Sequence, residues 1–515
     1  MRNFIGGVAV ATAGLAAQPA AADVSAEDVW ANMLAPYKAL NAEIVAEPVR
    51  EGDRLIVENL TVRFVFDEGS GQVLLTTNGV TFEENGDGTV SVLYPEKAEM
   101  EARLEDTLED ASEALILTLE TNGAALEQTA SGEPGDVVHS VVYRDVVQDM
   151  RLTFPASVGG TDIGVNVRAA SGEGTYRVTE GDLVSMSTGY AYDAVDIMTI
   201  VEEMVESPDG DDPMMTRNET VQHMTGLKMD FEVALPKGVL SIMNLSQGLR
   251  DGFRLGLRST VESSRAKEAH FVDGDQVETL TVESGAQDVE MRLDRAGLAI
   301  NGDIKELASA LTGQLMPVTT AIGIAEVEAR FSMPVNRTDR PGEMIVALSL
   351  DGLELDDGIW SMLDPGGALP RDPAALGFDA TFAVEVLVDL LDIDARQSVA
   401  DAQIFLLQGL DLRNLLVEVA SARLTGDAEV AFDNDDLETY DGLPAPEGVV
   451  NLVLEGGNTL LDTLVAAGLL PEDQAGGVRM MMGLFAVKGE GEDTLTSTIE
   501  MKPGGVIEAN GQRVR

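Results

Sequence analysis

Few residue types in this sequence could carry out chemistry, and they do not fall into a known catalytic spacing. The 515 residues include no Cys and three His, which excludes thiol nucleophiles, disulfides, zinc–thiolate sites and iron–sulfur clusters. His139, His223 and His270 lie far apart in sequence, so we expect each to be a strand or surface residue. No Walker A loop, G-x-G-x-x-G, G-x-S-x-G or H-E-x-x-H is present. We therefore assign no catalytic residue, cofactor or metal ligand, and the sequence favours a non-enzymatic protein.

Carboxylates are the abundant reactive groups, with 89 Asp and Glu against 34 Lys and Arg. With so many acids, any fold brings some carboxylate pairs by chance to the ~5 to 9 Å separation that acid–base catalysis uses. No catalytic pair can therefore be selected from the sequence. The densest run is 433–438, where Asp433 and Asp435 could bind calcium, but Leu437 stands at a ligand position of the EF-hand pattern. The run 209–212 departs from that pattern too. We expect solvated turns at both, and a carboxylate- or calcium-dependent hydrolase remains the alternative function.

The formal net charge of -55 indicates which partners the protein avoids. Such a field repels nucleic acid and anionic lipid head groups. The acids are spread along the chain, which is typical of a surface that keeps a protein soluble in salty surroundings. Two Trp and seven Tyr are few for a sugar-binding site, and we expect Trp30 and Trp360 to pack in the core.

Residues 1–22 predict an export signal. Arg2 supplies the positive start, residues 4–17 are small and apolar, and Ala20 to Ala22 form a cleavage site. We expect cleavage after Ala22 and a periplasmic chain that begins at Asp23. No later stretch reaches the ~18 apolar residues of a transmembrane helix, so no transmembrane segment is expected.

The dominant period of the remaining sequence is two, which favours strands. Residues 53–67 are rich in β-branched and aromatic side chains, and their alternation slips near Asn59-Leu60 as a β-bulge requires. Hairpins are predicted where turn residues divide such runs, namely around 83–88, 180–182 and 273–275, with further strands at 114–120 and 137–154. The predicted strands and turns make the chain reverse direction every 8 to 15 residues, without the regular spacing of βαβ units. This pattern predicts a large curved antiparallel sheet.

Helical patterns are sparse and lie between the strands. Residues 25–40 begin with a Ser cap and carry apolar side chains at helical spacing. Short helices are predicted at 238–249, 304–311, 358–363 and 459–469. Similar Gly-Leu sequences near several of these helices suggest a degenerate strand–helix–strand repeat. The predicted fold class is mainly β with short helices (α+β).

Domain boundaries are weak. The polar stretch 207–213 is the best linker candidate, which gives an N-terminal β-rich region at 23–206 and a C-terminal one at 214–515, or one continuous elongated domain. The stretch 364–373 is expected to end a helix and turn the chain into a strand at 377–388.

Methionine is the notable part of the apolar composition. Twenty-one Met occur, including the triplet 480–482 and the pair 214–215. Their soft, unbranched side chains could line an adaptable groove for a lipid or a hydrophobic polypeptide. The favoured interpretation is that they fill a large core.

Three segments carry a family resemblance. The sequence DVSAEDVWAN at 23–32, the phrase LDGL to IW at 350–360 leading into LDPGGALPRDP at 363–373, and the ending TSTIE to EANGQ at 496–512 resemble an alphaproteobacterial family named domain of unknown function 2125. LLDTLVAAGLL at 460–470 resembles, more distantly, the C-terminal part of the exported YdgA-like family. These resemblances imply an uncharacterised envelope protein of β-rich units and bring no catalytic residues.

The sequence thus predicts an exported, non-enzymatic envelope protein with an apolar interior. Its role would be that of a scaffold, or of a carrier or chaperone of apolar ligands, with a lipid or an envelope protein as partner. A purely structural role in envelope organisation stays open beside it.

Overall fold

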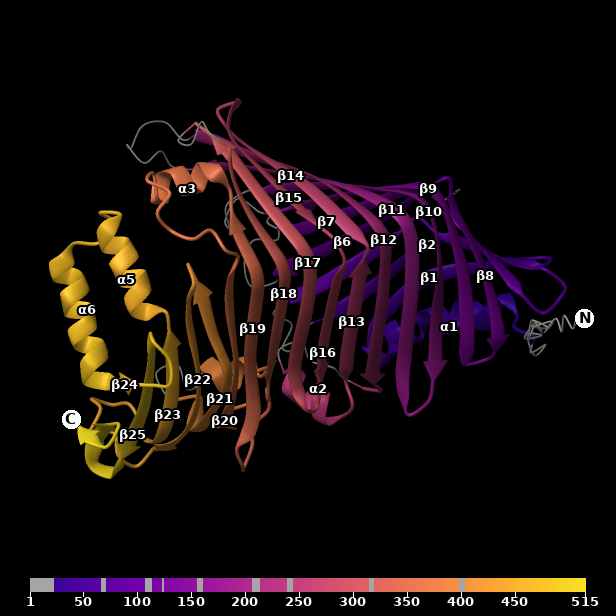
Figure 1. Ribbon diagram of the computed structural model, residues 1–515. Coiled ribbons are helices and arrows are strands. Elements are labelled where there is room, and N and C mark those ends of the chain that lie inside the picture. The colour runs from indigo at the N-terminus through magenta and orange to yellow at the C-terminus, as the bar shows by residue number, and fades with distance from the viewer. Residues whose placement is uncertain are drawn as a thin grey trace, which may run out of the picture.

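One continuous antiparallel sheet of 27 strands makes up most of the protein (Figure 1). The computed structural model describes residues 23–65, 71–106, 114–122, 125–154, 161–205, 214–238, 244–314, 319–397 and 403–515. The predicted fold class, mainly β with short helices and a large curved antiparallel sheet, is confirmed. The predicted signal segment 1–22 and the linker candidate 207–213 lie outside the described residues.

The strands before residue 240 form the first half of the sheet. They are β1 (Glu43–Glu51), β2 (Arg54–Val65), β3 (Gly71–Thr77), β4 (Val80–Glu84), β5 (Val90–Leu93), β6 (Lys97–Asp106), β7 (Leu115–Asn122), β8 (Leu126–Glu133), β9 (Asp136–Thr153), β10 (Asp162–Glu180), β11 (Leu183–Val205) and β12 (Met214–Pro236). β11 and β12 flank the linker candidate and pair along their whole length.

The second half of the sheet continues the same meander. Its strands are β13 (Arg254–Val261), β14 (Ser263–Val272), β15 (Asp275–Ser284), β16 (Gln287–Asp294), β17 (Gly297–Gly313), β18 (Thr320–Met333), β19 (Gly342–Leu355), β20 (Ala374–Val386), β21 (Phe405–Val419), β22 (Ala422–Asp433), β23 (Ala445–Glu455), β24 (Val487–Lys488), β25 (Thr494–Lys502), β26 (Val506–Ala509) and β27 (Gln512–Arg513). The helices are α1 (Ala26–Ala39), α2 (Leu245–Arg250), α3 (Asp357–Leu363), α4 (Ile393–Gln397), α5 (Gly457–Ala466), α6 (Glu472–Phe485) and the short 3-10 helix η4 (Pro503–Gly505).

The predicted hairpins form where the turn residues stand. β4 and β5 pair around Gly86, β10 and β11 around Gly181, and β14 and β15 around Gly274. Gly86 and Gly274 have positive φ angles, which glycine adopts without a steric penalty. The turn at 364–373 likewise ends α3 and leads into β20, as predicted.

The chain crosses the sheet in successive passes, each made of one long strand or of two strands in line. These passes bend once, along a line that we call the crease. β2 bulges at residues 58–59, since its register with β1 shifts between Leu60 and Val57, which confirms the bulge predicted from the sequence. β12 pairs with β13 along one half and with β14 along the other, so β13 and β14 are two halves of one bent pass. Residues with positive φ mark the crease at Gly79, Asp145, Gly226, Glu306 and Gly352.

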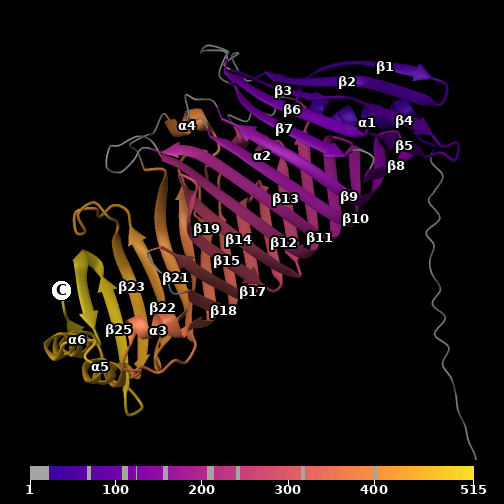
Figure 2. The same cartoon turned by 90° about the horizontal axis from the view of Figure 1, so that it is seen from above.

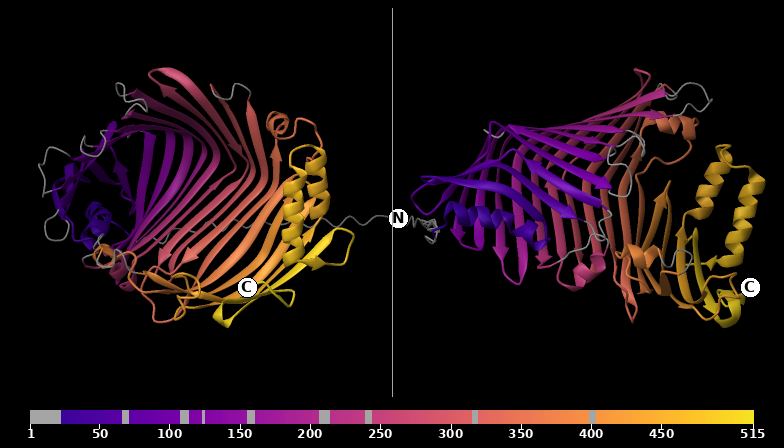
Figure 3. Two further views of the ribbon diagram at one scale, coloured as in Figure 1. Left: turned by 90° about the vertical axis from the view of Figure 1, so that its left-hand side faces the viewer. Right: turned by 180° about the vertical axis from the view of Figure 1, so that it is seen from behind.

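Bulges bend a strand and increase its twist, and a row of them folds the sheet into a trough. The left panel of Figure 3, which looks along the trough, shows the strands bent around an open interior. Figure 2 shows the same sheet from above, curving from the N-terminal strands to the C-terminal end. The sheet thus forms an open trough.

Helix α1 lies inside the curve. It contacts β2 and β4 as well as β9 to β12, and one helix can touch such distant strands only from the concave side. Ser25 caps it in a capping box with Asp28, as the sequence predicted. Val29 packs in a cluster with Phe82, and Ala35 packs in a second cluster with Val178. The best-buried core of the protein therefore lies around α1.

Two helix predictions need correction. Residues 304–311 were predicted to be helical, but they belong to strand β17. The backbone at Glu306 has a φ of 51°, and this bulge brings Ile304 and Leu307, three residues apart, to the same face. The sequence therefore imitates a helical period, and the strand–helix–strand repeat fails at this point. Helix α2 begins later than predicted, at Leu245.

The helices at 357–363 and 457–466 agree with the predictions, whereas α6 was missed. Its Gly476-Gly477 pair weakens helix propensity, and it follows Pro471 without a side-chain cap. None of the described helices combines the length and apolarity needed to cross a bilayer.

The crease yields a stability prediction at Gly79, which has a φ of 103°. A Cβ there would lie 2.4 Å from the carbonyl oxygens of Val57 and Glu58. We expect Gly79→Ala to lower the free energy of unfolding by about 1–3 kcal/mol more than a positive-φ glycine in open space. Gly274→Ala is the matched control, because its φ is 89° and no atom lies within 4 Å of the added Cβ. Equal urea midpoints for the two variants would contradict the crease geometry.

Candidate functional site

The concave face of the sheet carries a continuous, mostly apolar band of uncharged side chains. Residues directly opposite each other on neighbouring strands share one face, so the strand registers define a row along the sheet. Its members, from β9 to β25, are His139, Tyr176, Thr188, Phe231, Leu257, Met291, Ile300, Phe331, Val346, Ala380, Leu412, Ala428, Val450 and Ile499. No charged residue occurs in this row.

A neighbouring row on the same face is equally apolar, with Leu255, Leu293, Leu298 and Met333 opposite one another. Both rows face the side on which α1 lies, because Val178 and Leu235 of the same face pack against α1 and its neighbours. We call this lining the apolar trough: the concave-face side chains of β9 to β25 that the two rows contain.

Much of the apolar trough remains open to solvent. Leu257 and Ile300 in the middle of the long row are 38% and 39% exposed, although both are large apolar residues on the concave face. In an ordinary sheet packed against a second layer these positions would be buried. Contiguous exposed apolar surface of this extent marks a ligand or partner site in a soluble protein.

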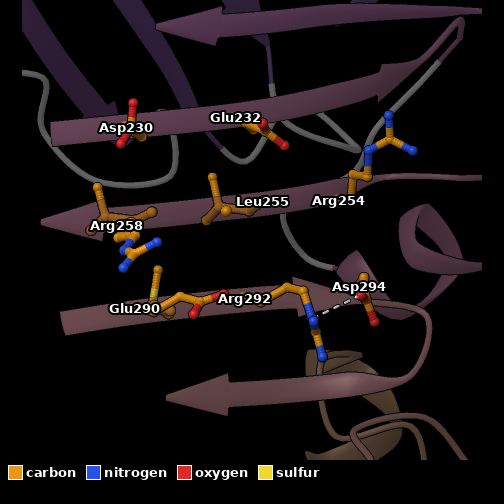
Figure 4. A pocket seen from close by; sticks show the side chains of 11 residues that line it. Asp230, Glu232, Arg254, Leu255, Arg258, Glu290, Arg292 and Asp294 are labelled. Atoms are coloured by element: carbon orange, nitrogen blue, oxygen red, sulfur yellow. Dashed lines mark ion pairs between the residues drawn. The ribbon is translucent and has the colours of Figure 1, made fainter. Parts of the chain in front are cut away.

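The convex face has the opposite character. Its rows alternate in charge, as in Asp230, Arg258 and Glu290, which stand opposite one another on β12, β13 and β16. Figure 4 shows these side chains on neighbouring strands around a shallow depression of about 370 Å³. Arg258 also pairs with Asp288 at 2.7 Å. The depression is thus lined by exposed ion pairs and offers no enclosed site.

One rim of the trough is closed where β10 to β18 end. Ala35 and Ala39 of α1, Leu249 of α2, Phe253 and Val335 form one buried cluster with the strand ends. These residues cover the apolar side chains of that rim, and the opposite ends of the same strands have no such cluster among the described residues. The apolar trough is thus sealed along one side of its N-terminal half.

A cavity of about 450 Å³ lies between α1 and strands β2 to β11. Trp30, Leu60, Met100 and Leu119 are among its apolar lining residues, and Glu99 is the one charged residue that lines it. Five of the seven tyrosines line it as well: Tyr37, Tyr94, Tyr143, Tyr176 and Tyr190. Tyr192 packs on Tyr143 with ring centroids 5.3 Å apart. The cavity therefore offers aromatic faces and hydroxyl groups within an apolar surface.

The polar groups near this cavity are held uncharged. Tyr94 donates a hydrogen bond to Gln128 Oε1 at 3.0 Å, and Gln128 Nε2 lies 2.8 Å from His139 Nδ1. Burial raises the pKa of Tyr94 to about 12 and lowers the pKa of His139 to about 4. Burial also raises the pKa of Tyr143 and Tyr176. At neutral pH these tyrosines and His139 are accordingly uncharged, and Glu99 remains as the charged group of the cavity lining.

The three histidines all lie in strands, as predicted, and they do not come together. His139 is buried in β9. His223 on β12 is exposed, with Nδ1 2.7 Å from Asp196. His270 on β14 has Nδ1 2.6 Å from Asn218.

The acidic run 433–438 is a turn between β22 and β23, as predicted. The backbone amide of Asp435 donates to Asp433, and the amide of Thr439 donates to Asp436 at 3.0 Å. The Thr439 hydroxyl also donates to Asp436 at 2.7 Å, and this hydrogen bond, together with that of the Thr439 amide, lowers the pKa of Asp436. The second run, 209–212, lies outside the described residues.

A different carboxylate cluster forms on the convex face from Asp303, Glu326 and Glu328. Lys305 pairs with both Asp303 and Glu326, so an internal cation already neutralises part of the cluster. The hydrolase alternative gains no support from this arrangement.

Two predictions about apolar residues were wrong. Met480 and Met481 were expected to fill a core, but they lie exposed on α6. Trp360 was expected in the core too, yet α3 has no buried residue, and the Arg371 guanidinium lies 5.5 Å from the Trp360 ring centroid. Trp30 does pack as predicted, with its ring centroid 5.9 Å from that of Phe82.

The tyrosine cluster is the feature that sequence reasoning missed. Its members are spread from Tyr37 on α1 and Tyr94 after β5 to Tyr192 on β11, and only the fold brings these distant segments together. The sequence did contain one sign of this cluster. Tyr190 and Tyr192 are two residues apart in a strand, so their side chains lie on the same face of the sheet.

Comparison with known families agrees with part of the resemblance. Residues 262–507 match the family described as "Uncharacterized protein conserved in bacteria (DUF2125)", which confirms the predicted family for that region. The matched residues include β14 to β25, α3, α5 and α6, and thus the C-terminal half of the apolar trough. No curated protein matches the chain at a significant level.

His139 gives a pH prediction. Its pKa is about 4 in the folded protein and near 6.5 in the unfolded chain. Between these values only the unfolded state binds the proton, so stability falls as pH falls through this window. We expect the free energy of unfolding to drop by about 2 kcal/mol from pH 7 to pH 5 through this residue.

Urea titrations at both pH values check this, with His139→Gln as the test and His223→Gln as the exposed control. His139→Gln should flatten the pH dependence, and His223→Gln should leave it unchanged. The same slope in wild type and His139→Gln would show that His139 is not held neutral by burial.

Proposed function

We propose that this protein is an exported envelope protein that carries lipids, with their acyl chains lying in the apolar trough. The observation that carries the proposal is the long row of mostly apolar, partly exposed side chains on a concave face. The described residues place no second layer over the C-terminal half of this face. Export is supported by the signal-like residues 1–22, and periplasmic localisation after cleavage at Ala22 remains part of the proposal.

The chemistry of the apolar trough matches an acyl chain better than a polar substrate. A methylene chain gains about 0.8 kcal/mol for each CH₂ that leaves water, and it needs no hydrogen bond from its site. The long row contains no charged residue and few hydrogen-bonding groups, whereas the convex rows alternate Asp, Glu and Arg. A ligand with one polar end could place that end at the open rim, in water.

The length of the apolar trough suits more than one lipid. The long row crosses 14 strands, from β9 to β25, and thus 13 spacings of ~4.8 Å, which gives about 60 Å. An acyl chain spans half of the ~30 Å hydrocarbon core of a bilayer. Several chains can therefore lie side by side across the strands.

The large acidic charge has a role in this proposal. A protein with an open apolar face tends to associate with its own copies, and strong net charge of one sign opposes this association. Charged side chains lie on the convex face, as in the row of Asp230, Arg258 and Glu290. They would keep the carrier soluble while its apolar trough is empty.

The first test replaces two apolar trough residues by polar ones. In Leu257→Gln/Ile300→Gln we expect about thirtyfold weaker binding of a phosphatidylcholine with a fluorescent acyl chain, because each half-exposed side chain contributes about 1 kcal/mol of apolar contact. Lipid retained after purification from cells, extracted and measured by mass spectrometry, should fall in parallel.

The matched control is Met198→Gln/Val449→Gln on the convex face. Met198 and Val449 are each 38% exposed, but Met198 stands opposite Asn166 and Val449 opposite Glu429. This variant should bind the probe as the wild type does. The proposal fails if wild-type protein retains no lipid and does not bind the probe, or if both double variants lose binding equally.

A further inference from the structure

The open rim of the C-terminal half carries a second apolar surface. At this rim β19 ends at Leu355, β21 ends at Val419 and β23 ends at Glu455. Helices α3 and α5 begin directly after β19 and β23, so both lie along this rim. Figures 1 and 3 show α3 beside the pair of α5 and α6. We call the exposed apolar residues of these helices the apolar rim: Met362, Leu363, Leu469, Val478, Met480, Met481 and Leu484.

The apolar residues of α6 point away from the protein. Val478, Met480, Met481 and Leu484 are 43%, 72%, 52% and 53% exposed, whereas Ala475 is the one buried residue of this helix. α5 packs against β22 and α6 packs against α5. The two helices thus form a hairpin that projects from the sheet with apolar side chains in water.

Charge is depleted in the parts of this hairpin that project. Residues 463–471 and 480–487 contain no charged side chain, although charged residues make up 24% of the chain. Arg479, which lies between these stretches, pairs with Asp462 of α5. These two stretches of the hairpin therefore have no fixed charge with which to select a charged partner.

The opposite rim of the same strands is different. Its loop between β22 and β23 also exposes two large apolar residues, Leu437 and Leu443. Carboxylates surround them, including those of Asp435, Asp436 and Asp441. One rim of the C-terminal half is thus apolar and the other is acidic.

The apolar rim is continuous with the apolar trough. Ile322 and Leu376 are concave-face residues near the ends of β18 and β20 at this rim, and both are partly exposed. α3 contacts β18 directly. An acyl chain that leaves the apolar trough over this rim would therefore meet α3 first.

We propose that the apolar rim docks onto a lipid bilayer and that lipids pass between the bilayer and the apolar trough over it. This inference rests on the proposed carrier function and names the donor or acceptor of the lipid. Amphipathic helices bury apolar faces in the headgroup region of a bilayer, and the hairpin presents such a face. The net charge of -55 repels anionic headgroups, so docking depends on insertion of apolar side chains and is strongest on uncharged membranes.

The test measures sedimentation of the chain starting at Asp23 with sucrose-loaded phosphatidylcholine vesicles. Met480→Gln/Met481→Gln should weaken vesicle binding about tenfold or more, since two exposed side chains lose their insertion energy. Leu437→Gln/Leu443→Gln on the acidic rim is the matched control. The exposed fractions are similar, 72% and 52% for the two Met and 42% and 68% for the two Leu, and this control should bind as the wild type does. Vesicles with anionic phosphatidylglycerol should bind the wild type more weakly.

Three results would overturn the inference. One is vesicle binding by Met480→Gln/Met481→Gln equal to that of the wild type, and another is stronger binding to anionic vesicles. The third is absence of vesicle binding together with a wild-type dimer, seen by analytical ultracentrifugation, that Met480→Gln/Met481→Gln dissociates. That result would assign the apolar rim to a second copy of the chain.

Loading with the fluorescent phosphatidylcholine from detergent separates this inference from the proposed function. If Met480→Gln/Met481→Gln still loads the probe but no longer binds vesicles, both proposals stand. If the wild type binds vesicles through the apolar rim but never loads the probe, docking stands and the carrier function fails.

Discussion

A sheet with one apolar face needs something to cover that face, and this constraint governs the whole molecule. Alternation along strands such as β12, β13 and β16 places apolar side chains on the concave side and charges on the convex side. Over the N-terminal half, α1 and α2 supply part of the cover and create the best-buried core. Over the C-terminal half no layer of the described chain lies on the concave face, and apolar side chains there stay partly exposed. A ligand that is itself apolar is the simplest partner for such a surface.

The crease decides what shape that face takes. A flat sheet with an open apolar side would stack on another copy, whereas a bent one encloses a volume into which a second sheet does not fit. The bend comes from single residues in each pass, such as Gly79, Gly226 and Gly352, whose positive φ angles interrupt the ladder. The same residues that shape the apolar trough therefore limit association through it, together with the strong net charge.

Local signals in the sequence predicted local structure well. The turn at Gly274, the cap at Ser25 and the bulge near Leu60 each follow from the conformational preferences of a few neighbouring residues. The helix predicted at 304–311 failed because a bulge at Glu306 shifts the alternation by one and imitates a helical period. The tyrosine cluster and the exposure of Met480 depend on which distant segments meet, and one-dimensional patterns do not contain that information. For the same reason the apolar trough could be suggested from composition but its lining could not be chosen.

The most direct test of an apolar trough filled by lipid is site-specific photo-crosslinking along one strand in the cell envelope. On β18, Ala329 and Phe331 face the concave side, while Glu328 and Arg330 face the convex side. A photoreactive phenylalanine analogue at each of the four positions should crosslink to lipid at 329 and 331 and not at 328 or 330. Crosslinks of equal yield at all four positions, or none at 329 and 331, would contradict the account.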